Sequence, residues 1–189
     1  MNEIERLAKL IFEAGQLKRL PRSGWFLAGI ENPESVAEHS WRASFIGLIL
    51  AKMEKVDENK VVKMCLLHDL AETRIGDVNR VNDRYIENKS EKKAAEDILS
   101  GLFDNSLLDI VNEYNDRETK EAFVARDADL LEIFVQAKEY NEKISNLWPA
   151  WLKNQKVLLK TKSAKELANK LEQMDPTSWW HDLVKSPKS

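Results

Sequence analysis

The stretch "LLHDLAETRIGD", residues 66–77, places a histidine beside an aspartate, then a glutamate, and a second aspartate after a glycine. An apolar run, "VVKMCLL", leads into it. Charged side chains seldom approach a core unless they are paired or bound to a metal. The stretch therefore predicts the end of a buried helix at which a cation site is built.

Helix signals continue from this stretch over the whole chain. Apolar residues recur every three or four positions, and the 189 residues include only 6 glycines and 5 prolines. This pattern is typical of helices and shows almost no strand alternation. We therefore expect an all-α fold, a helical bundle with helices near residues 3–19, 35–55, 57–67, 90–103, 107–114, 119–145 and 163–174.

Several helix starts can be read from capping residues. The sequences "SVAE" from Ser35 and "SAKE" from Ser163 have the form of capping boxes, and Asp57 is a third predicted N-cap. The helix over residues 3–19 is amphipathic, and its apolar face is formed by Ile4, Leu7, Ala8, Ile11, Phe12 and Leu17.

Composition excludes several classes of protein. With 29 Lys+Arg against 32 Asp+Glu, the net charge of −3 argues against a nucleic-acid polymer as partner. No segment reaches the ~18 unbroken apolar residues of a membrane span. The single cysteine, Cys65, allows no disulfide and is read as a buried small hydrophobe. We expect one cytoplasmic domain spanning residues 1–189, with no linker or repeat.

The candidate metal ligands come from three predicted helices. His39 lies in the first turn after Ser35, His68 and Asp69 form the doublet, and Asp129 follows in "ARDADLLEIF". Imidazole suits zinc, iron, cobalt or nickel, whereas carboxylate suits harder ions such as manganese and magnesium. The mixed set predicts one divalent ion with positions open for water and substrate. Either histidine taken singly could instead be a core residue.

These motifs resemble the HD-domain metal-dependent phosphohydrolases, whose signature is a histidine, a distant His-Asp doublet and a later aspartate. The string "HDLAETRIGD" is similar to the HD-x-x-E-x-x-x-G-D pattern of the 5′-deoxynucleotidase branch, and "NPESVAEHSWR" resembles the start of that branch's first ligand helix. The similarity covers about residues 17–140. Residues 141–189 are expected to form a C-terminal helical extension.

The resemblance implies a role for each residue of the site. The expected ion is cobalt, manganese, zinc, nickel or iron, held between helices by His39, His68, Asp69 and Asp129. The carboxylates expected to position water and move protons are Glu72 and Asp77. Phosphate is expected to bind Arg22, with Arg19 as the alternative, because guanidinium pairs with phosphate oxygens. The sugar or base is expected to contact Trp25 and Glu113.

The implied reaction removes the 5′-phosphate from deoxyribonucleoside 5′-monophosphates. Two alternatives remain open: another HD-type hydrolase, acting on cyclic nucleotides, nucleoside triphosphates or guanosine tetraphosphate, or a metal-binding interaction module without turnover. The resemblance also implies a homodimer. The tryptophans at positions 148, 151, 179 and 180 are candidate interface anchors or core residues.

Overall fold

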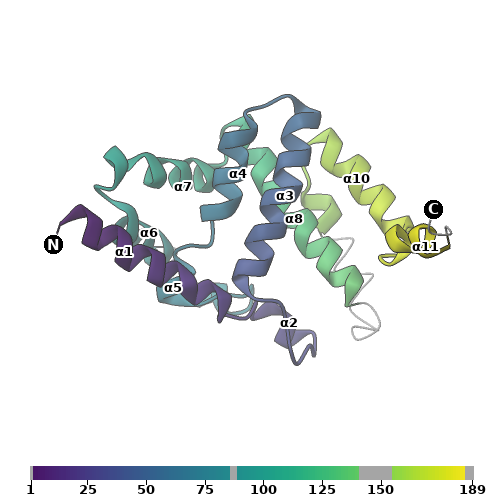
Figure 1. Ribbon diagram of the computed structural model, residues 1–189, viewed down its shortest axis with the longest axis horizontal. Helices are drawn as coiled ribbons and strands as arrows, with labels where there is room; N and C mark the ends of the chain where they lie inside the picture. The colour runs from purple at the N-terminus through teal and green to yellow at the C-terminus, as the bar shows by residue number, and fades with distance from the viewer. Residues whose placement is uncertain (1, 86–88, 141–154, 186–189) are drawn as a thin grey trace.

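The computed structural model describes residues 2–85, 89–140 and 155–185 (Figure 1). These residues form helices and no strand, apart from one isolated bridge between Pro21 and Ser35. The expected all-α fold is therefore confirmed. The α-helices are α1 (Glu3–Ala14), α2 (Gly24–Leu27), α3 (Val36–Glu54), α4 (Glu58–Leu67), α5 (Glu72–Ile75), α6 (Lys89–Leu99), α7 (Ser106–Asp116), α8 (Lys120–Glu139), α10 (Lys162–Gln173) and α11 (Ser178–Lys185).

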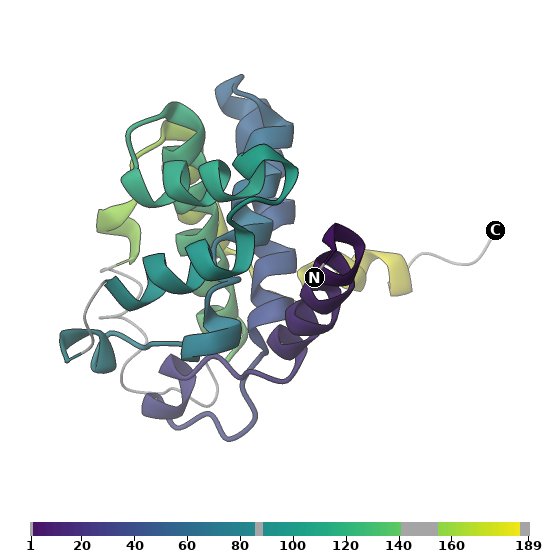
Figure 2. The same ribbon diagram turned by 90° about the vertical axis from the view of Figure 1, so that its left-hand side faces the viewer.

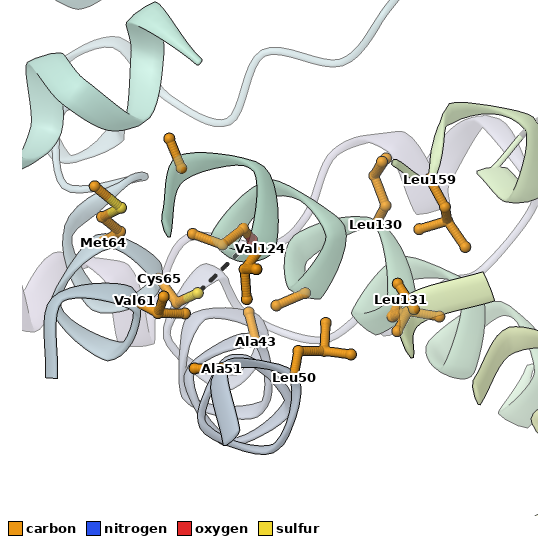
Figure 3. Packing of buried hydrophobic residues seen from close by; sticks show 14 of the residues in the cluster. Ala43, Leu50, Ala51, Val61, Met64, Cys65, Val124, Leu130, Leu131 and Leu159 are labelled. Carbon is orange, nitrogen blue, oxygen red and sulfur yellow. Dashed lines mark hydrogen bonds between the residues drawn. The ribbon is translucent and has the colours of Figure 1, made fainter. Parts of the chain in front are cut away.

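The centre of the bundle is formed by α3, α4 and α8, with α7 and α10 against its flanks (Figure 1). Buried aliphatic side chains such as Leu50, Val61 and Leu130 fill the space between them (Figure 3). A Cβ on Gly47 would lie 2.9 Å from Cys65 Sγ, so glycine is what lets α3 and α4 approach closely. This packing fixes the relative positions of α3, α4 and α8, from which the candidate ligands come.

Cys65 is buried in this core, as predicted. Its thiol donates a hydrogen bond of 3.7 Å to the carbonyl of Ala125, and burial raises its pKa. A thiol that is buried and held protonated is poorly nucleophilic. Cys65 therefore serves packing.

Two of the three predicted N-caps are confirmed. Ser35 forms the capping box with Glu38, and the side chain of Asp57 accepts hydrogen bonds at the start of α4. The prediction for Ser163 is wrong, because Thr161 caps α10 and its side chain accepts from the backbone of Ala164. Asp127 holds Thr161 in place, since its carboxylate accepts the Thr161 backbone N–H at 2.7 Å. A tertiary contact thus selects the earlier of two possible caps.

The predicted first helix is shorter than expected. It ends at Ala14 and continues as a 3₁₀ helix over Gly15–Lys18. Much of its apolar face is exposed, including Ile4, Ile11 and Phe12. Figure 1 shows α1 and the yellow α11 at opposite ends of the molecule, and Figure 2 shows the purple α1 at the edge of the bundle. The helix α11 lies within the expected C-terminal helical extension. Of the predicted helix 119–145, α8 covers the part to Glu139, and residues 141–145 lie outside the described ranges.

No helix among the described residues is long and apolar enough to cross a membrane. The longest, α8, interrupts its apolar residues with several charged side chains.

Candidate active site

The His-Asp doublet lies at a helix end, as predicted. The helix α4 stops at Leu67, and His68 is its C-cap. Residues 68–71 form a turn in which the backbone N–H of Glu72 donates to the carbonyl of Asp69 at 3.0 Å. Adjacent side chains diverge on a regular helix. Because the chain turns here, His68 and Asp69 reach a common point, and Asp69 Oδ2 lies 3.2 Å from His68 Nε2.

Both candidate histidines present the same ring nitrogen to that point. His39 Nδ1 donates to the carboxylate of Glu132 at 2.5 Å, and His68 Nδ1 donates to the carbonyl of Cys65 at 2.8 Å. A proton on Nδ1 leaves the lone pair of a neutral imidazole on Nε2. Both Nε2 atoms are buried and make no hydrogen bond within the described part of the chain. Two buried acceptors without partners in the described residues fit a site that binds a cation.

Two carboxylates complete the set. Asp129 Oδ1 lies 3.2 Å from His39 Nε2 and 4.0 Å from His68 Nε2, while Asp69 Oδ2 lies 3.8 Å from His39 Nε2. Burial opposes the charge of Asp129, but the adjacent Arg126 guanidinium holds its pKa well below the usual range. Asp129 is therefore a carboxylate, as a ligand must be. Two imidazoles and two carboxylates fit one divalent transition ion.

A second group of possible ligands shares one of these histidines. Donor atoms of Glu34, His39 and Glu132 lie within 4.8 Å of one another. Both glutamates already have partners, since Glu34 accepts from Trp25 Nε1 at 3.0 Å and Glu132 accepts from Arg42 Nε at 2.9 Å. Both groups of possible ligands found among the described residues contain His39. A two-metal diesterase would need a second, separate group of ligands.

Glu132 instead supports the first ligand. It is fully buried on α8. One oxygen of its carboxylate accepts a hydrogen bond from His39 Nδ1, and the other accepts one from Arg42. Burial alone would raise its pKa, but His39 and Arg42 lower it. This arrangement fixes the ring orientation and tautomer of His39.

Glu72 is a buried carboxyl at the rim of the ligand set. It begins α5, a separate short helix that follows the turn at residues 68–71. Its Oε2 has no hydrogen-bond partner among the described residues. Burial, and after it the charge of Asp69, raises the pKa of Glu72 to about 11. A cation held by Asp69 would oppose this shift, because it would offset the charge that contributes to it.

Asp77 is brought back to the site by Gly76. Gly76 has a φ of +80°, a conformation that a side chain would strain. Asp77 then accepts from the backbone N–H of Ser23 and from Arg22 Nη1 at 3.1 Å. The same Arg22 atom donates to Asp69 Oδ2 at 3.1 Å. Burial opposes the charge of Arg22, but Asp69 and Asp77 outweigh it and raise its pKa.

These groups open into one cavity of about 590 Å³. The cavity contains a polar wall with four arginines and an apolar wall from α2 and α8 that includes Leu130 and Ile133. Of the residues predicted from sequence, the ones that line it are Arg22, Trp25, His68, Asp69, Glu72, Asp77 and Asp129. His39 lies beneath them, fully buried.

Two predicted substrate residues are not brought to the cavity. Arg19 donates to Gln16 at 3.2 Å, at the end of the 3₁₀ helix that follows α1. Glu113 on α7 pairs with Lys60 at 2.7 Å and accepts from Thr119 at 2.6 Å. Neither lines the described cavity, so Arg22 is the better placed of the two arginines.

The sequence reading overlooked several residues of the site. Glu132 carried a signal, as a lone acid three positions after Asp129 in an otherwise apolar stretch of helix. Arg126 carried the same kind of signal three positions before Asp129. No local pattern marked the others, because the contacts that matter are between helices. The overlooked residues are Arg42, Tyr114, Arg126, Glu132 and Gln155.

Comparison with known proteins agrees with this geometry. A family model described as HD domain matches residues 14–174. "5′-deoxynucleotidase HDDC2" from Dictyostelium discoideum is 38% identical over 141 residues, which cover 68% of this chain and 74% of that protein. The protein of the same name from Danio rerio is 35% identical over 147 residues, covering 75% of this chain and 72% of the relative.

Solved structures show the same fold. A conserved hypothetical protein from Pyrococcus furiosus superposes with a TM-score of 0.75 at 33% identity, covering 88% of this chain and 99% of that one. Since the family match extends over most of the chain and includes all four candidate ligands, the protein belongs to the HD domain family.

Proposed function

We propose that this protein is a 5′-deoxynucleotidase, a metal-dependent hydrolase that converts deoxyribonucleoside 5′-monophosphates to deoxynucleosides and inorganic phosphate. One observation carries the proposal. Two buried, unpartnered imidazole nitrogens and two carboxylates converge at the wall of a cavity that also contains Arg22, Glu72 and Asp77. The names of the relatives from Dictyostelium discoideum and Danio rerio support this activity.

The ligands proposed for the divalent ion are His39, His68, Asp69 and Asp129. When bound, a divalent cation polarises phosphate oxygens and lowers the pKa of water, which supplies a nucleophile near neutral pH. Cobalt, manganese, zinc, nickel and iron all suit the mixed nitrogen and oxygen donors.

The other groups act on substrate and water. Arg22 lines the cavity and has three further N–H donors besides the two that the carboxylates use, so it can bind a phosphate oxygen. The free Oε2 of Glu72 can accept a proton or hydrogen bond from the attacking water. Asp77, held by Arg22 and Ser23, orients the guanidinium and can assist the leaving O5′ oxygen. Trp25 and the apolar wall leave room for the sugar and base.

We also propose a cytoplasmic homodimer built from one domain over residues 1–189. Exposed aromatic side chains on α3 and α11 support self-association, because exposed apolar groups mark interaction surfaces. Trp41 and Phe45 stack with ring centroids 6.2 Å apart and are 68% and 54% exposed. On α11, Trp179 is 73% exposed and Trp180 39%. Trp148 and Trp151 lie outside the described residues. If the protein sediments as a monomer at micromolar concentration, the homodimer proposal is wrong.

The activity is tested by measuring phosphate release from a panel of nucleotides with each candidate metal. The panel includes deoxynucleoside and ribonucleoside 5′-monophosphates, a cyclic nucleotide, a nucleoside triphosphate and guanosine tetraphosphate. We expect metal-dependent turnover on the deoxynucleoside monophosphates. Preferential turnover of any other class would replace the proposal with that activity, and metal binding without turnover would indicate an interaction module.

A further inference from the structure

Gln155 is a buried amide on the wall of the active-site cavity. The residue is 3% exposed and lines the same cavity as His68, Asp69 and Asp129. Its Oε1 is buried, and no described residue gives it a hydrogen bond. Burying an amide without a partner is unfavourable, because the lost hydration is not replaced. An unsatisfied polar group that faces a binding cavity calls for a partner supplied from outside the chain.

The position of Gln155 is set by the segment that follows it. Leu159 packs into the core with Leu130 and Leu131, and the backbone N–H of Lys160 donates to Asp127 at 2.9 Å. Residues 155–160 therefore run beside α8. This is the helix that supplies Asp129 to the metal site and Ile133 to the apolar wall.

The cavity is lined by both charged and apolar residues. The ligand set and Arg22 provide the charges that a phosphate requires. The apolar residues, including Trp25, Leu130 and Ile133, offer van der Waals contact to an apolar surface such as the face of a ring. Trp25 and Ile133 belong to one apolar cluster, so they form a continuous surface. A nucleobase has apolar faces and a polar edge, and that edge needs a hydrogen-bonding group.

We infer that Gln155 is a specificity-determining residue whose side-chain amide hydrogen-bonds the nucleobase of the substrate. The inference rests on the proposed deoxynucleotidase activity and deepens it. An amide offers a carbonyl acceptor and two N–H donors, so it matches the alternating donors and acceptors of a base edge. The segment that follows α8 thus contributes to substrate choice.

The test compares Gln155→Met with wild type in the metal-loaded enzyme. Steady-state kinetics are measured for the four deoxynucleoside 5′-monophosphates, and inhibition by inorganic phosphate reports on the metal and Arg22. We expect kcat/KM to fall about threefold to tenfold for the bases that the amide recognises, as the loss of a neutral hydrogen bond predicts. The other bases should change less, so the base ranking should shift. Inhibition by phosphate should stay as in wild type.

Thermal stability separates recognition from a structural role. Because methionine removes an unpaired buried amide, Gln155→Met should melt at the same temperature as wild type or higher. Gln136→Met is the matched control, since Gln136 is also a buried amide but accepts a hydrogen bond from Arg42. That variant should melt lower and keep the wild-type base ranking. If Gln155→Met melts lower than wild type, Gln155→Leu repeats the kinetic comparison with a side chain of different shape.

Three results would overturn the inference while leaving the activity intact. Unchanged kinetics in both Gln155 variants would show that the amide contacts no substrate. An equal fall for all four deoxynucleotides would place it against the sugar, and weaker inhibition by phosphate would place it in the phosphate site. A wild-type enzyme that hydrolyses no deoxynucleotide would instead overturn the proposed function itself.

Discussion

Arg22 Nη1 lies 3.1 Å from Asp77 Oδ1, and this ion pair joins two residues that are 55 positions apart in the chain. The pair connects the segment before α2 to the loop after α5, and both residues line the cavity. Because Arg22 also donates to Asp69, the position of the guanidinium depends on both acids. The proposed phosphate-binding group and a proposed catalytic acid are therefore one unit.

The Arg22–Asp77 pair is tested by a double-mutant cycle on kcat/KM. Arg22→Ala and Asp77→Ala should each reduce kcat/KM. The fold-reduction in the double variant should be much smaller than the product of the two single fold-reductions. Residues in direct contact typically couple by about 0.5–3 kcal/mol. Each single variant leaves the other member without its partner, which is the source of the coupling. Strict multiplicative behaviour would mean that the two side chains act separately.

His68→Ala tests metal ligation. The substitution should remove bound metal and turnover together, because it deletes one of two buried imidazoles that face the site. A metal that binds only the folded state stabilises it by mass action, so the rise in melting temperature on adding manganese or cobalt should also disappear. His181→Ala is the matched control, since His181 lies on α11, contacts Thr177 and does not line the cavity. Full metal content in the His68 variant would make that histidine a core residue.

The sequence was sufficient for what depends on local pattern. Helical periodicity and the caps at Ser35 and Asp57 specify α3 and α4, and hence the ends at which His39 and His68 lie. The doublet at a helix end could be expected because the apolar run stops there. The Ser163 cap was missed because Asp127, far away in the chain, holds Thr161 as the cap.

The supporting shell of the site could not be read in the same way. Glu132 becomes a partner of His39 only when α3 and α8 pack side by side, a contact between residues 93 positions apart. Glu113 looked suitable by its neighbours, yet α7 directs it toward Lys60. Gln155 acquires its place through the contacts of Leu159 and Lys160 with α8. In each case tertiary packing decides, and the local sequence is silent.

Glu132→Gln tests whether that carboxylate positions His39. An amide keeps the volume but accepts the His39 Nδ1 proton more weakly and can present an N–H instead, so metal affinity should fall by about 10–100-fold. The affinity is measured by competition with a chelator, which does not depend on turnover. Glu139→Gln is the control, because Glu139 pairs with the same Arg42 at 2.7 Å but does not touch His39. Wild-type affinity in Glu132→Gln would limit Glu132 to a structural role.

Glu72→Gln and Asp77→Asn separate catalysis from ligation. Both variants should retain the metal, since neither residue is in the proposed ligand set. Turnover should fall by about 10²–10⁴-fold if the carboxylates position water and move protons. Metal content and kinetics must be measured on the same preparations. Loss of metal in the Glu72 variant would make Glu72 a ligand, and near wild-type rates in both would contradict the proposed mechanism.

The stability of the metal-free protein should depend on pH through Glu72. Burial and the charge of Asp69 raise its pKa from an ordinary value of 4.5 to about 11. The fold thus favours the neutral carboxyl, and the stability that this carboxyl contributes is fully present below pH 4.5 and is lost as the pH rises toward 11. Glutamine cannot ionise, so metal-free Glu72→Gln should melt above wild type at pH 8, and the gap should narrow toward pH 5. Adding manganese should shrink the gap at pH 8, because a cation beside Asp69 favours the ionised carboxylate. The test is to measure melting curves of both proteins from pH 5 to pH 9, with and without metal. A difference in melting temperature that does not change with pH would show that Glu72 ionises freely in the fold.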